Sequence, residues 1–465
     1  MTERSLSRIF KAYDVRGTVP DQLDARSAYA IGVAFGRFAA EDGAERVLVA
    51  RDMRPSGEEL GRGLVAGLAS VGMAATDLGL ASTDLLYFAS GHHGSPGVML
   101  TASHNPSGYN GMKFCLAGAR PVGQESGLVQ ILGLAEQALA EAPDGAALEA
   151  ALAAAEADHE DLLAAFAAHV RGFVDVAALR PLQVVADTAN GMGGLIAPAV
   201  FDGLPFVLEI LYGDLDGTFP NHPADPIQVE NLADLRARIL ERRADVGLAF
   251  DGDADRVFLV DERGEPLSGS TTTAMVATAM LERFPGATIL HNCITSKAVP
   301  EIVRELGGTP VRTRVGHSFI KQVMAETGAR FGGEHSGHYY FRDNFRADSG
   351  IIAALVVLEV LSRSGTTLSE LRTRYERYAD SGERNTEVAD PASVIDAVAA
   401  HYEAAGAATD RFDGLTADLG EWWFNLRPSN TEPLLRLNVE AADPAACEAR
   451  VAEVLGLVHE LGGGR

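Results

Sequence analysis

Residues 98–106 have the sequence V-M-L-T-A-S-H-N-P, an apolar run followed by polar residues. Consecutive apolar residues are typical of a buried strand, and Pro106 disfavours a helical continuation. The stretch therefore predicts a strand that ends in a loop and leaves Ser103 at the strand's end. A serine in this position is a candidate nucleophile, which raises the question of what activates it.

Similar apolar runs that end in polar or glycine-rich turns recur at residues 46–52, 182–191, 246–253 and 287–292. Segments of helical character separate them, and this alternation predicts α/β units. Residues 130–176 are rich in alanine and glutamate and predict helices at a first domain boundary. A second boundary is expected near residues 362–369, because W-W-F-N-L and L-L-R-L-N-V-E-A beyond it alternate like strands of a smaller α+β domain.

The charge balance excludes two classes of partner. Acidic residues outnumber basic ones by 64 to 39, for a net charge of −25, so neither nucleic acid nor an anionic membrane is expected as a partner. No apolar stretch of about 18 residues and no signal-like N-terminus is found, which predicts a cytoplasmic protein. Three widely spaced cysteines fit neither a disulfide framework nor a zinc site.

Lysine is rare in this chain. Only four of the 39 basic residues are lysines, at positions 11, 113, 297 and 321. Lysine has a compact, titratable ammonium that arginine does not replace, so a lysine beside a candidate site suggests a function. Lys113 follows Ser103 by ten positions, and Lys11 lies in F-K-A-Y-D-V-R-G beside Tyr13 and Arg16.

The stretch D-G-D-A-D-R, Asp251 to Arg256, follows an apolar run and places three carboxylates at alternate positions. Packed together without a cation they would repel one another, which leaves a solvated surface turn or a metal site. Its place directly after a predicted buried strand favours the metal. A small number of carboxylates with open positions suits Mg²⁺.

Two further loops carry polar groups. G-G-E-H-S-G-H, residues 332–338, offers donors and acceptors that suit sugar hydroxyls, although polar glycine-rich loops are common. R-P-S-N-T-E-P, residues 427–433, offers a guanidinium, hydroxyls and an amide that suit a phosphate. The alternative for the second loop is a rigid turn bounded by prolines.

Taken in order, T-A-S-H-N-P, D-G-D-A-D-R, G-E-H-S-G-H and R-P-S-N-T-E-P resemble the α-D-phosphohexomutases, more narrowly the bacterial phosphomannomutase/phosphoglucomutase branch. The resemblance implies that Ser103 carries the transferable phosphoryl group, with His104 and Asn105 in its loop. It implies that Asp251, Asp253, Asp255 and Ser103 bind Mg²⁺ and that Arg256 lies near the phosphate.

The resemblance also assigns the residues that bind the substrate. It assigns sugar recognition to Glu334, Ser336 and His338, with His335 at a variable position. It assigns the grip on the second phosphate to Arg427, Ser429, Asn430 and Thr431. Tyr13, Arg16 and Lys113 would surround the phosphoserine, and Lys113 or His338 would transfer protons.

The resemblance also implies the domain organisation. Three similar α/β domains, residues 1–150, 151–256 and 257–368, would be followed by a smaller α+β domain, residues 369–465, around a central cleft. The junction near residue 256 comes from the resemblance alone. A monomer or a dimer is expected.

The expected reaction interconverts hexose 6-phosphate and hexose 1-phosphate, of mannose and of glucose, through a hexose 1,6-bisphosphate. Ser103 lacks a convincing base with an orienting partner, so a metal-bound phosphoserine is favoured over a hydrolase nucleophile. The alternatives are a phosphoglucosamine mutase and a metal-dependent sugar phosphatase. A sugar-phosphate-binding protein without activity is disfavoured because Ser103, the aspartates and the basic residues are all present.

Overall fold

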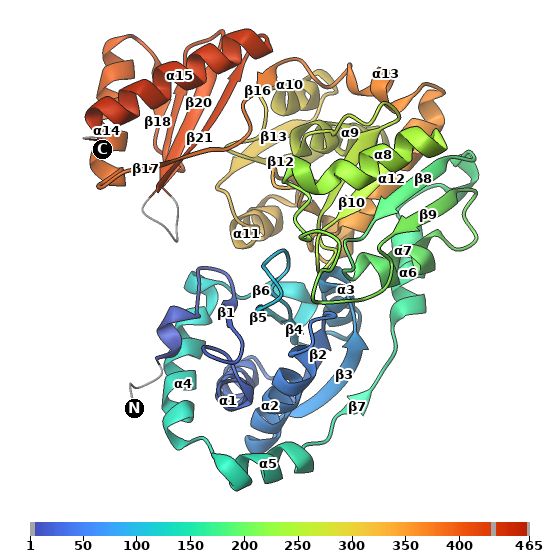
Figure 1. The fold of residues 1–465 in the computed structure, drawn as a ribbon, viewed down its shortest axis with the longest axis vertical. Coiled ribbons are helices and arrows are strands. Elements are labelled where there is room, and N and C mark those ends of the chain that lie inside the picture. The colour runs from blue at the N-terminus through green and yellow to red at the C-terminus, as the bar shows by residue number, and fades with distance from the viewer. Residues whose placement is uncertain (1–4, 429–433, 463–465) are drawn as a thin grey trace. The chain divides into compact units, whose positions relative to one another are not determined.

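The computed structural model describes residues 5–428 and 434–462 of the chain (Figure 1). These residues fall into two compact units, Met1–Ser268 with Ser336–Ser369, and Gly269–His335 with Glu370–Arg465. Sheets with flanking helices make up most of both units. In the described ranges, no helix combines the length and the apolar character needed to cross a bilayer.

The first sheet has the strand order β1-β5-β4-β2-β3-β7, with β6 paired to β5. Its strands are β1 (Val15–Thr18), β2 (Arg46–Arg51), β3 (Ala74–Leu80), β4 (Gly97–Leu100), β5 (Tyr109–Leu116), β6 (Arg120–Pro121) and β7 (Asp158–His159). The apolar run at 98–100 is the central strand β4, parallel to β2 and antiparallel to β5. As predicted, Ser103 follows the end of this strand.

The helices of this part are α1 (Ala25–Glu41), α2 (Gly57–Ser70), α3 (Thr83–His93), α4 (Leu128–Glu141), α5 (Gly145–Ala154) and α6 (Leu163–Arg171). Helices α1 and α2 cross closely at Gly63, which has no side chain. A Cβ on Gly63 would lie only 2.5 Å from the carbonyl oxygen of Ala25. Buried aliphatic residues of both helices and of β2 and β4 share one core. The predicted alanine-rich helices are α4, α5 and α6.

The second sheet has the order β11-β10-β8-β9. Its strands are β8 (Gln183–Asp187), β9 (Val207–Leu211), β10 (Val246–Phe250) and β11 (Val257–Asp261), flanked by α7 (Gly193–Phe201) and α8 (Ala233–Arg242). Strand β10 runs parallel to β8 and antiparallel to β11. The junction predicted near residue 256 therefore falls between two paired strands of one sheet, which extends to Asp261.

The second unit contains the third sheet, in which β12 (Thr288–Asn292) lies between β13 (Thr309–Thr313) and β14 (Phe331–Gly333). Helices α9 (Gly269–Arg283), α10 (Ala298–Glu305) and α11 (His317–Thr327) accompany it. Strand β15 (Tyr339–Phe341) and helix α12 (Gly350–Ser364) belong to the first unit, and α13 (Leu368–Arg372) follows them in the chain. Both neighbours of β12 run parallel to it, as in an α/β unit.

The last sheet has the order β16-β21-β20-β19-β18, with β17 paired to β21. Its strands are β16 (Ala379–Asp380), β17 (Arg384–Glu387), β18 (Ala408–Asp410), β19 (Leu415–Asp418), β20 (Trp423–Pro428) and β21 (Leu434–Ala441). All of its pairs are antiparallel, and α14 (Pro391–Ala404) and α15 (Pro444–Leu461) share its core. The prediction of α/β domains followed by a smaller α+β domain is confirmed.

Candidate active site

Ser103 occupies a constrained loop at the carboxyl end of β4. Its φ of 48° lies in the left-handed region, which costs free energy for a residue with a side chain. Only 4% of the residue is exposed, and its N–H donates to Thr101 Oγ1 at 2.9 Å. The surrounding contacts therefore hold the serine in one conformation.

The D-G-D-A-D-R stretch forms the loop between β10 and β11, and its aspartates are almost completely buried. Asp251, Asp253 and Asp255 are 0%, 0% and 1% exposed, and each offers an oxygen within 4.8 Å of the others. Among the residues that the structure describes, Asp253 Oδ1 and Asp255 Oδ1 find no hydrogen-bond partner. Burial, opposed in part by Arg256, raises the pKa of Asp251 to about 7. Buried carboxylates with unused oxygens fit a divalent cation better than a solvated turn.

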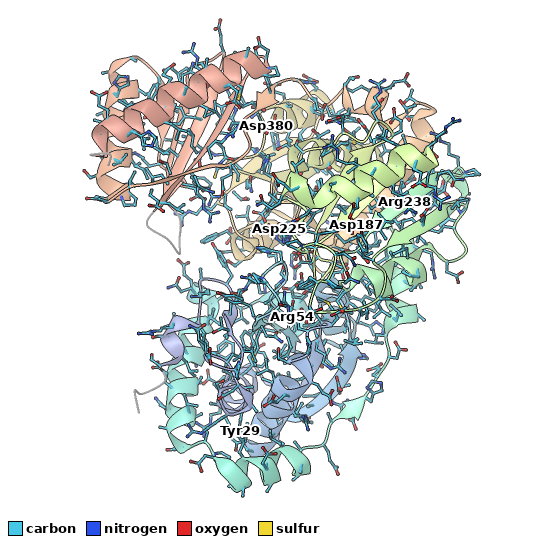
Figure 2. All side chains as sticks on the ribbon, in the orientation of Figure 1. Tyr29, Arg54, Asp187, Asp225, Arg238 and Asp380 are labelled. Atoms are coloured by element: carbon cyan, nitrogen blue, oxygen red, sulfur yellow. The ribbon has the colours of Figure 1, made fainter. Side chains whose placement is uncertain are left out.

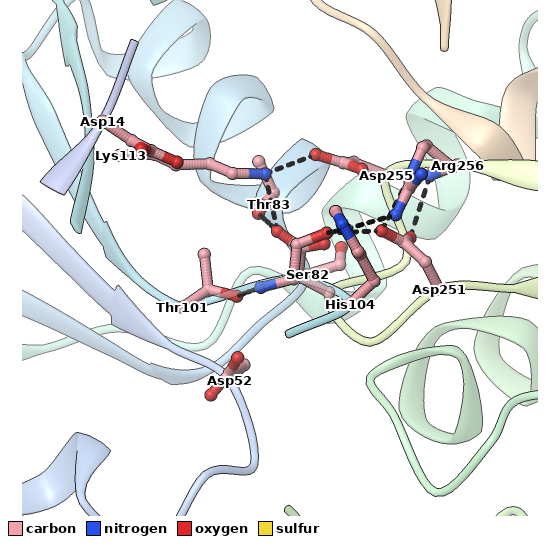
Figure 3. Close-up of polar contacts among 12 residues, drawn as sticks. Asp14, Asp52, Ser82, Thr83, Thr101, His104, Lys113, Asp251, Asp255 and Arg256 are labelled. Carbon is pink, nitrogen blue, oxygen red and sulfur yellow. Dashed lines mark hydrogen bonds and ion pairs between the residues drawn. The ribbon is translucent and has the colours of Figure 1, made fainter. Parts of the chain in front are cut away.

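The serine loop and the aspartate loop meet directly, as Figure 3 shows for their polar contacts. Ser103 Oγ donates to Asp251 Oδ2 at 2.7 Å. The main chains of the two loops also touch at Gly252. A Cβ on Gly252 would collide with the carbonyl oxygen of Ser103. Gly191, from the loop after β8, packs behind them, and a Cβ there would lie 2.7 Å from the Gly252 carbonyl oxygen. Only glycine allows this approach.

Arg256 joins the same cluster. Its Nε donates to Asp251 Oδ2 at 3.0 Å, and its Nη2 lies 2.7 Å from His104 Nδ1. Because arginine is always a donor, His104 accepts through Nδ1. Burial, together with the charges of Arg256 and Arg16, holds the pKa of His104 well below its usual value, so this imidazole is neutral.

Lys113, on β5, closes the cluster on another side. Its Nζ donates to Asp253 Oδ2 at 2.7 Å and to Asp255 Oδ2 at 2.6 Å (Figure 3). Burial alone would lower the pKa of Lys113, but the two carboxylates outweigh it and hold that pKa well above its usual value. Thr83, at the start of α3, also donates to Asp253 Oδ2, at 2.6 Å.

His338 lies in the first unit beside the aspartates. Its Nδ1 is 2.9 Å from Asp348 Oδ2 and 3.9 Å from Asp255 Oδ1. A carboxylate only accepts, so Nδ1 carries a proton and Nε2 is the accepting atom of the neutral ring. Asp348 had no signal in the sequence, because it becomes a partner of His338 only through the turn that follows β15.

The remaining predicted sugar residues divide between the two units. Ser336 is half-buried in the first unit. In the second unit, Glu334 is 1% exposed, and its Oε1 accepts from Asn292 Nδ2 at 3.2 Å and from the Gly316 N–H at 3.1 Å. His335 Nδ1 lies 3.2 Å from Ser270 Oγ in the same unit.

Near the N-terminus, Arg16 contacts the serine loop. Its Nη1 donates to Asn105 Oδ1 at 2.5 Å, while Nη2 is paired with Asp14 at the same distance. Tyr13 is half-buried just before β1. Together with Arg256 and Lys113, Arg16 supplies positive charge around the serine loop, in a chain that is strongly acidic as a whole.

Arg427, at the end of β20, is paired with an acidic residue that the sequence analysis did not consider. Its Nη2 lies 2.9 Å from Glu383 Oε2, and Arg436 Nη1 lies 3.1 Å from Glu383 Oε1. Within the described ranges, the Nε atoms of both arginines are buried without a hydrogen-bond partner. Two guanidiniums that share one carboxylate retain unused donors, as a phosphate site needs. The predicted residues Ser429, Asn430 and Thr431 lie outside the described residues.

Comparison with known proteins covers the whole chain. Models of phosphoglucomutase/phosphomannomutase alpha/beta/alpha domains I, II and III match residues 7–137, 147–264 and 268–378, and the C-terminal domain of the same family matches residues 383–457. A phosphomannomutase of Salmonella montevideo is 39% identical over 458 residues, which are 97% of this chain and 98% of that protein. A phosphomannomutase of Escherichia coli K12 is 38% identical over 459 residues, 97% and 99% of the two chains.

Solved structures agree with the sequence relatives. A phosphoglucomutase/phosphomannomutase family protein of Burkholderia thailandensis has a TM-score of 0.86 and 32% identity, and the match covers 100% of this chain and 98% of that one. A structure from Thermus thermophilus described as a phosphomannomutase shares the fold, with a TM-score of 0.82 at 24% identity over 97% and 98% of the two chains.

Proposed function

The chain belongs to the phosphoglucomutase/phosphomannomutase family and is a phosphohexomutase, and we propose that Ser103 carries the phosphoryl group that it transfers. One contact supports this role above the others. Ser103 Oγ lies 2.7 Å from Asp251, inside a cluster of buried carboxylates and cations. Phosphoryl transfer depends on positioning and on neutralising charge, and this cluster supplies both.

Asp251, Asp253 and Asp255 are proposed to hold Mg²⁺ together with an oxygen on Ser103. The unpartnered oxygens of Asp253 and Asp255 support this assignment. When bound, the cation neutralises charge on the carboxylates and on the phosphate oxygens. Thr83 and Lys113 then orient Asp253 through its Oδ2, which leaves Oδ1 for the metal.

The transfer step is proposed to use the basic residues around Ser103. A sugar hydroxyl attacks the phosphorus, the bond from phosphorus to Ser103 Oγ breaks, and the departing oxygen takes a proton from the Lys113 ammonium. The hydroxyl proton passes to His338 Nε2. Asp348 holds the opposite side of that ring through Nδ1. Arg256, Lys113 and Arg16 stabilise the negative charge on the phosphoryl oxygens. Glu334 and Ser336 are proposed to bind sugar hydroxyls.

The second phosphate of the substrate is proposed to bind Arg427 with Ser429, Asn430 and Thr431. After the first transfer the sugar carries two phosphates, and a hexose 1,6-bisphosphate must turn before the other phosphate returns to Ser103. One site that accepts a phosphate from either end of the sugar makes this possible. The product is then the isomeric monophosphate.

Mannose phosphate and glucose phosphate are the proposed substrates. The relatives named phosphomannomutase support the first of these, and the two sugars differ in the orientation of one hydroxyl. A phosphoglucosamine mutase is the remaining alternative within the reaction class. Turnover of mannose, glucose and glucosamine 1-phosphates, measured side by side, ranks these substrates.

The role of Ser103 is tested by intact mass and turnover of wild type and of Ser103→Ala. Wild type treated with hexose 1,6-bisphosphate should gain the mass of one phosphoryl group, and Ser103→Ala should gain none and lose mutase activity. Ser107→Ala, in the same loop, is the matched control. Full activity of Ser103→Ala would disprove the assignment. Inorganic phosphate released faster than isomerised sugar would identify a phosphatase instead.

A further inference from the structure

Arg54, labelled in Figure 2, contacts the serine loop, and its side chain is completely buried. It follows β2, and among the described contacts its guanidinium donates to Asp52 and to main-chain carbonyl oxygens of the serine loop and of Tyr109, the first residue of β5. The acceptors are Pro106 at 2.8 Å and Tyr109 at 2.9 Å for Nη1, and Ser103 at 2.8 Å and Asn105 at 2.6 Å for Nη2. One side chain thus satisfies four carbonyl groups between Ser103 and Tyr109.

Asp52 balances the charge of Arg54 and also reaches the loop from its other side. Its Oδ2 is 3.2 Å from Arg54 Nε, and its Oδ1 accepts from the Arg54 N–H at 3.0 Å. Thr101 hydrogen-bonds to Asp52 and accepts from the Ser103 N–H at 2.9 Å. The N–H and the C=O of Ser103 are therefore both tied to the same buried ion pair.

Stability alone is a weak reason for this arrangement. A buried ion pair often contributes no more than well-packed apolar residues of the same volume, because both charges lose their hydration. The contacts instead hold the main chain around Ser103, whose φ of 48° needs support from its surroundings. Segment 217–219 covers the arginine, with the Phe219 ring 5.1 Å from the guanidinium carbon.

We propose that Arg54 is a positioning residue that holds the main chain of residues 103–109, so that Ser103 Oγ points at Asp251 in a fixed place. This rests on the proposed role of Ser103. Lysine cannot do the same, because its three donors radiate from a single atom, whereas the guanidinium presents its donors as a planar fork. Thr101 supports the same loop from the side of the Ser103 N–H.

The test compares Arg54→Lys with Arg46→Lys, which alters an exposed arginine on β2 that is paired with Asp158. Turnover is expressed per phosphoserine, counted by intact mass after treatment with hexose 1,6-bisphosphate. Arg54→Lys should lower kcat about 100-fold, as small displacements of reacting groups do, and leave KM within about threefold of wild type. Arg46→Lys should match wild type in both. A merely structural role would lower the fraction of folded enzyme but not kcat per phosphoserine.

Thr101→Val tests the same support of the Ser103 main chain if Arg54→Lys does not fold. The change removes the acceptor of the Ser103 N–H with little change in volume, and kcat per phosphoserine should fall about tenfold. The proposal is overturned if wild type forms phosphoserine while each variant that folds keeps kcat within about threefold of it. Wild type that never forms phosphoserine contradicts the proposed function instead, so the two failures are distinguishable.

Discussion

Ser103 Oγ lies 2.7 Å from Asp251 Oδ2, although 148 positions separate the two residues in the chain. Each residue follows the carboxyl end of a strand, β4 for the serine and β10 for the aspartate, and the two strands belong to different sheets. The contact therefore depends on the packing of two α/β domains of the first unit against each other. Changes at either residue should affect the same chemical step.

Divalent cation should stabilise the wild-type protein, because it relieves the repulsion among Asp251, Asp253 and Asp255. Excess Mg²⁺ should raise the midpoint of thermal unfolding by a few degrees, since a ligand at about 100 times its Kd adds roughly 2.7 kcal/mol. Asp253→Asn should reduce this shift, and Asp202→Asn, at an exposed position in the second sheet's domain, should not. An undiminished shift in Asp253→Asn would place the cation elsewhere. Chelation should abolish mutase turnover.

Lys113→Arg should lower kcat by roughly 10²–10⁴, the range typical of groups that handle protons, although the charge is retained. The compact ammonium reaches Asp253 and Asp255 at once, at 2.7 and 2.6 Å, and a guanidinium is too wide for this position. Lys11→Arg is the control, because Lys11 is exposed and its Nζ donates only to the carbonyl oxygen of Arg8 among the contacts described. A rate close to wild type in Lys113→Arg would show that the residue supplies positive potential alone.

Arg427→Ala should raise KM for both the 1-phosphate and the 6-phosphate substrate, and Arg427→Lys should raise it less. The reason is that arginine matches two phosphate oxygens at once, whereas lysine offers a point charge. Arg384→Lys, at a surface pair with Glu448 in the same domain, is the matched control. A defect in one direction only would mean that the two phosphates use different sites, and no defect in either would exclude Arg427 from substrate binding.

Glu383→Gln offers a complementary test of the same site. Glu383 shares its carboxylate between Arg427 and Arg436 at 2.9 and 3.1 Å, so a substrate phosphate must compete with it. Removing its charge should lower KM in both directions and leave kcat close to wild type. A higher KM would instead mean that Glu383 orients the arginines. Initial rates over a range of substrate concentrations distinguish the two outcomes.

The ion pair of His222 and Asp187 predicts a pH dependence of stability. Burial alone would lower the pKa of His222, but the contact with Asp187 at 3.1 Å outweighs it and raises that pKa above the usual 6.5. The protonated histidine therefore stabilises the fold fully below about pH 6.5, and the contribution is lost as pH rises through the higher folded pKa. His222→Gln should lower the unfolding midpoint more at about pH 5.5 than at about pH 8.5. Exposed His159→Gln should show no such difference, and an equal loss for His222→Gln at both pH values would contradict the ion pair.

The sequence predicted features that depend on local pattern. Apolar runs followed by polar residues located β4 and β10, and so placed Ser103 and the three aspartates at strand ends. The pairing of Lys113 with Asp253 spans 140 positions, and that of Arg427 with Glu383 spans 44, so neither has a periodic signal. The contacts of Arg54 with the serine loop are the least predictable from the sequence. Their acceptors are main-chain carbonyl oxygens, which every residue has. The junction predicted near residue 256 falls between β10 and β11, which pair as a hairpin, and this pairing has no signal in the local pattern.

Gly252 touches the Ser103 carbonyl with no space for a methyl group, and Gly191 packs as closely behind it. The serine loop, the aspartate loop and the loop after β8 therefore pack main chain against main chain, with no side chain between them at the glycines. The position of each loop depends on the position of the next. One of these loops cannot be transferred to another protein without the other two. A designer who moves the serine motif into another α/β scaffold has to bring the two glycine loops with it, and a chimaera that exchanges only one of the two domains should fold each half and yet misalign the serine.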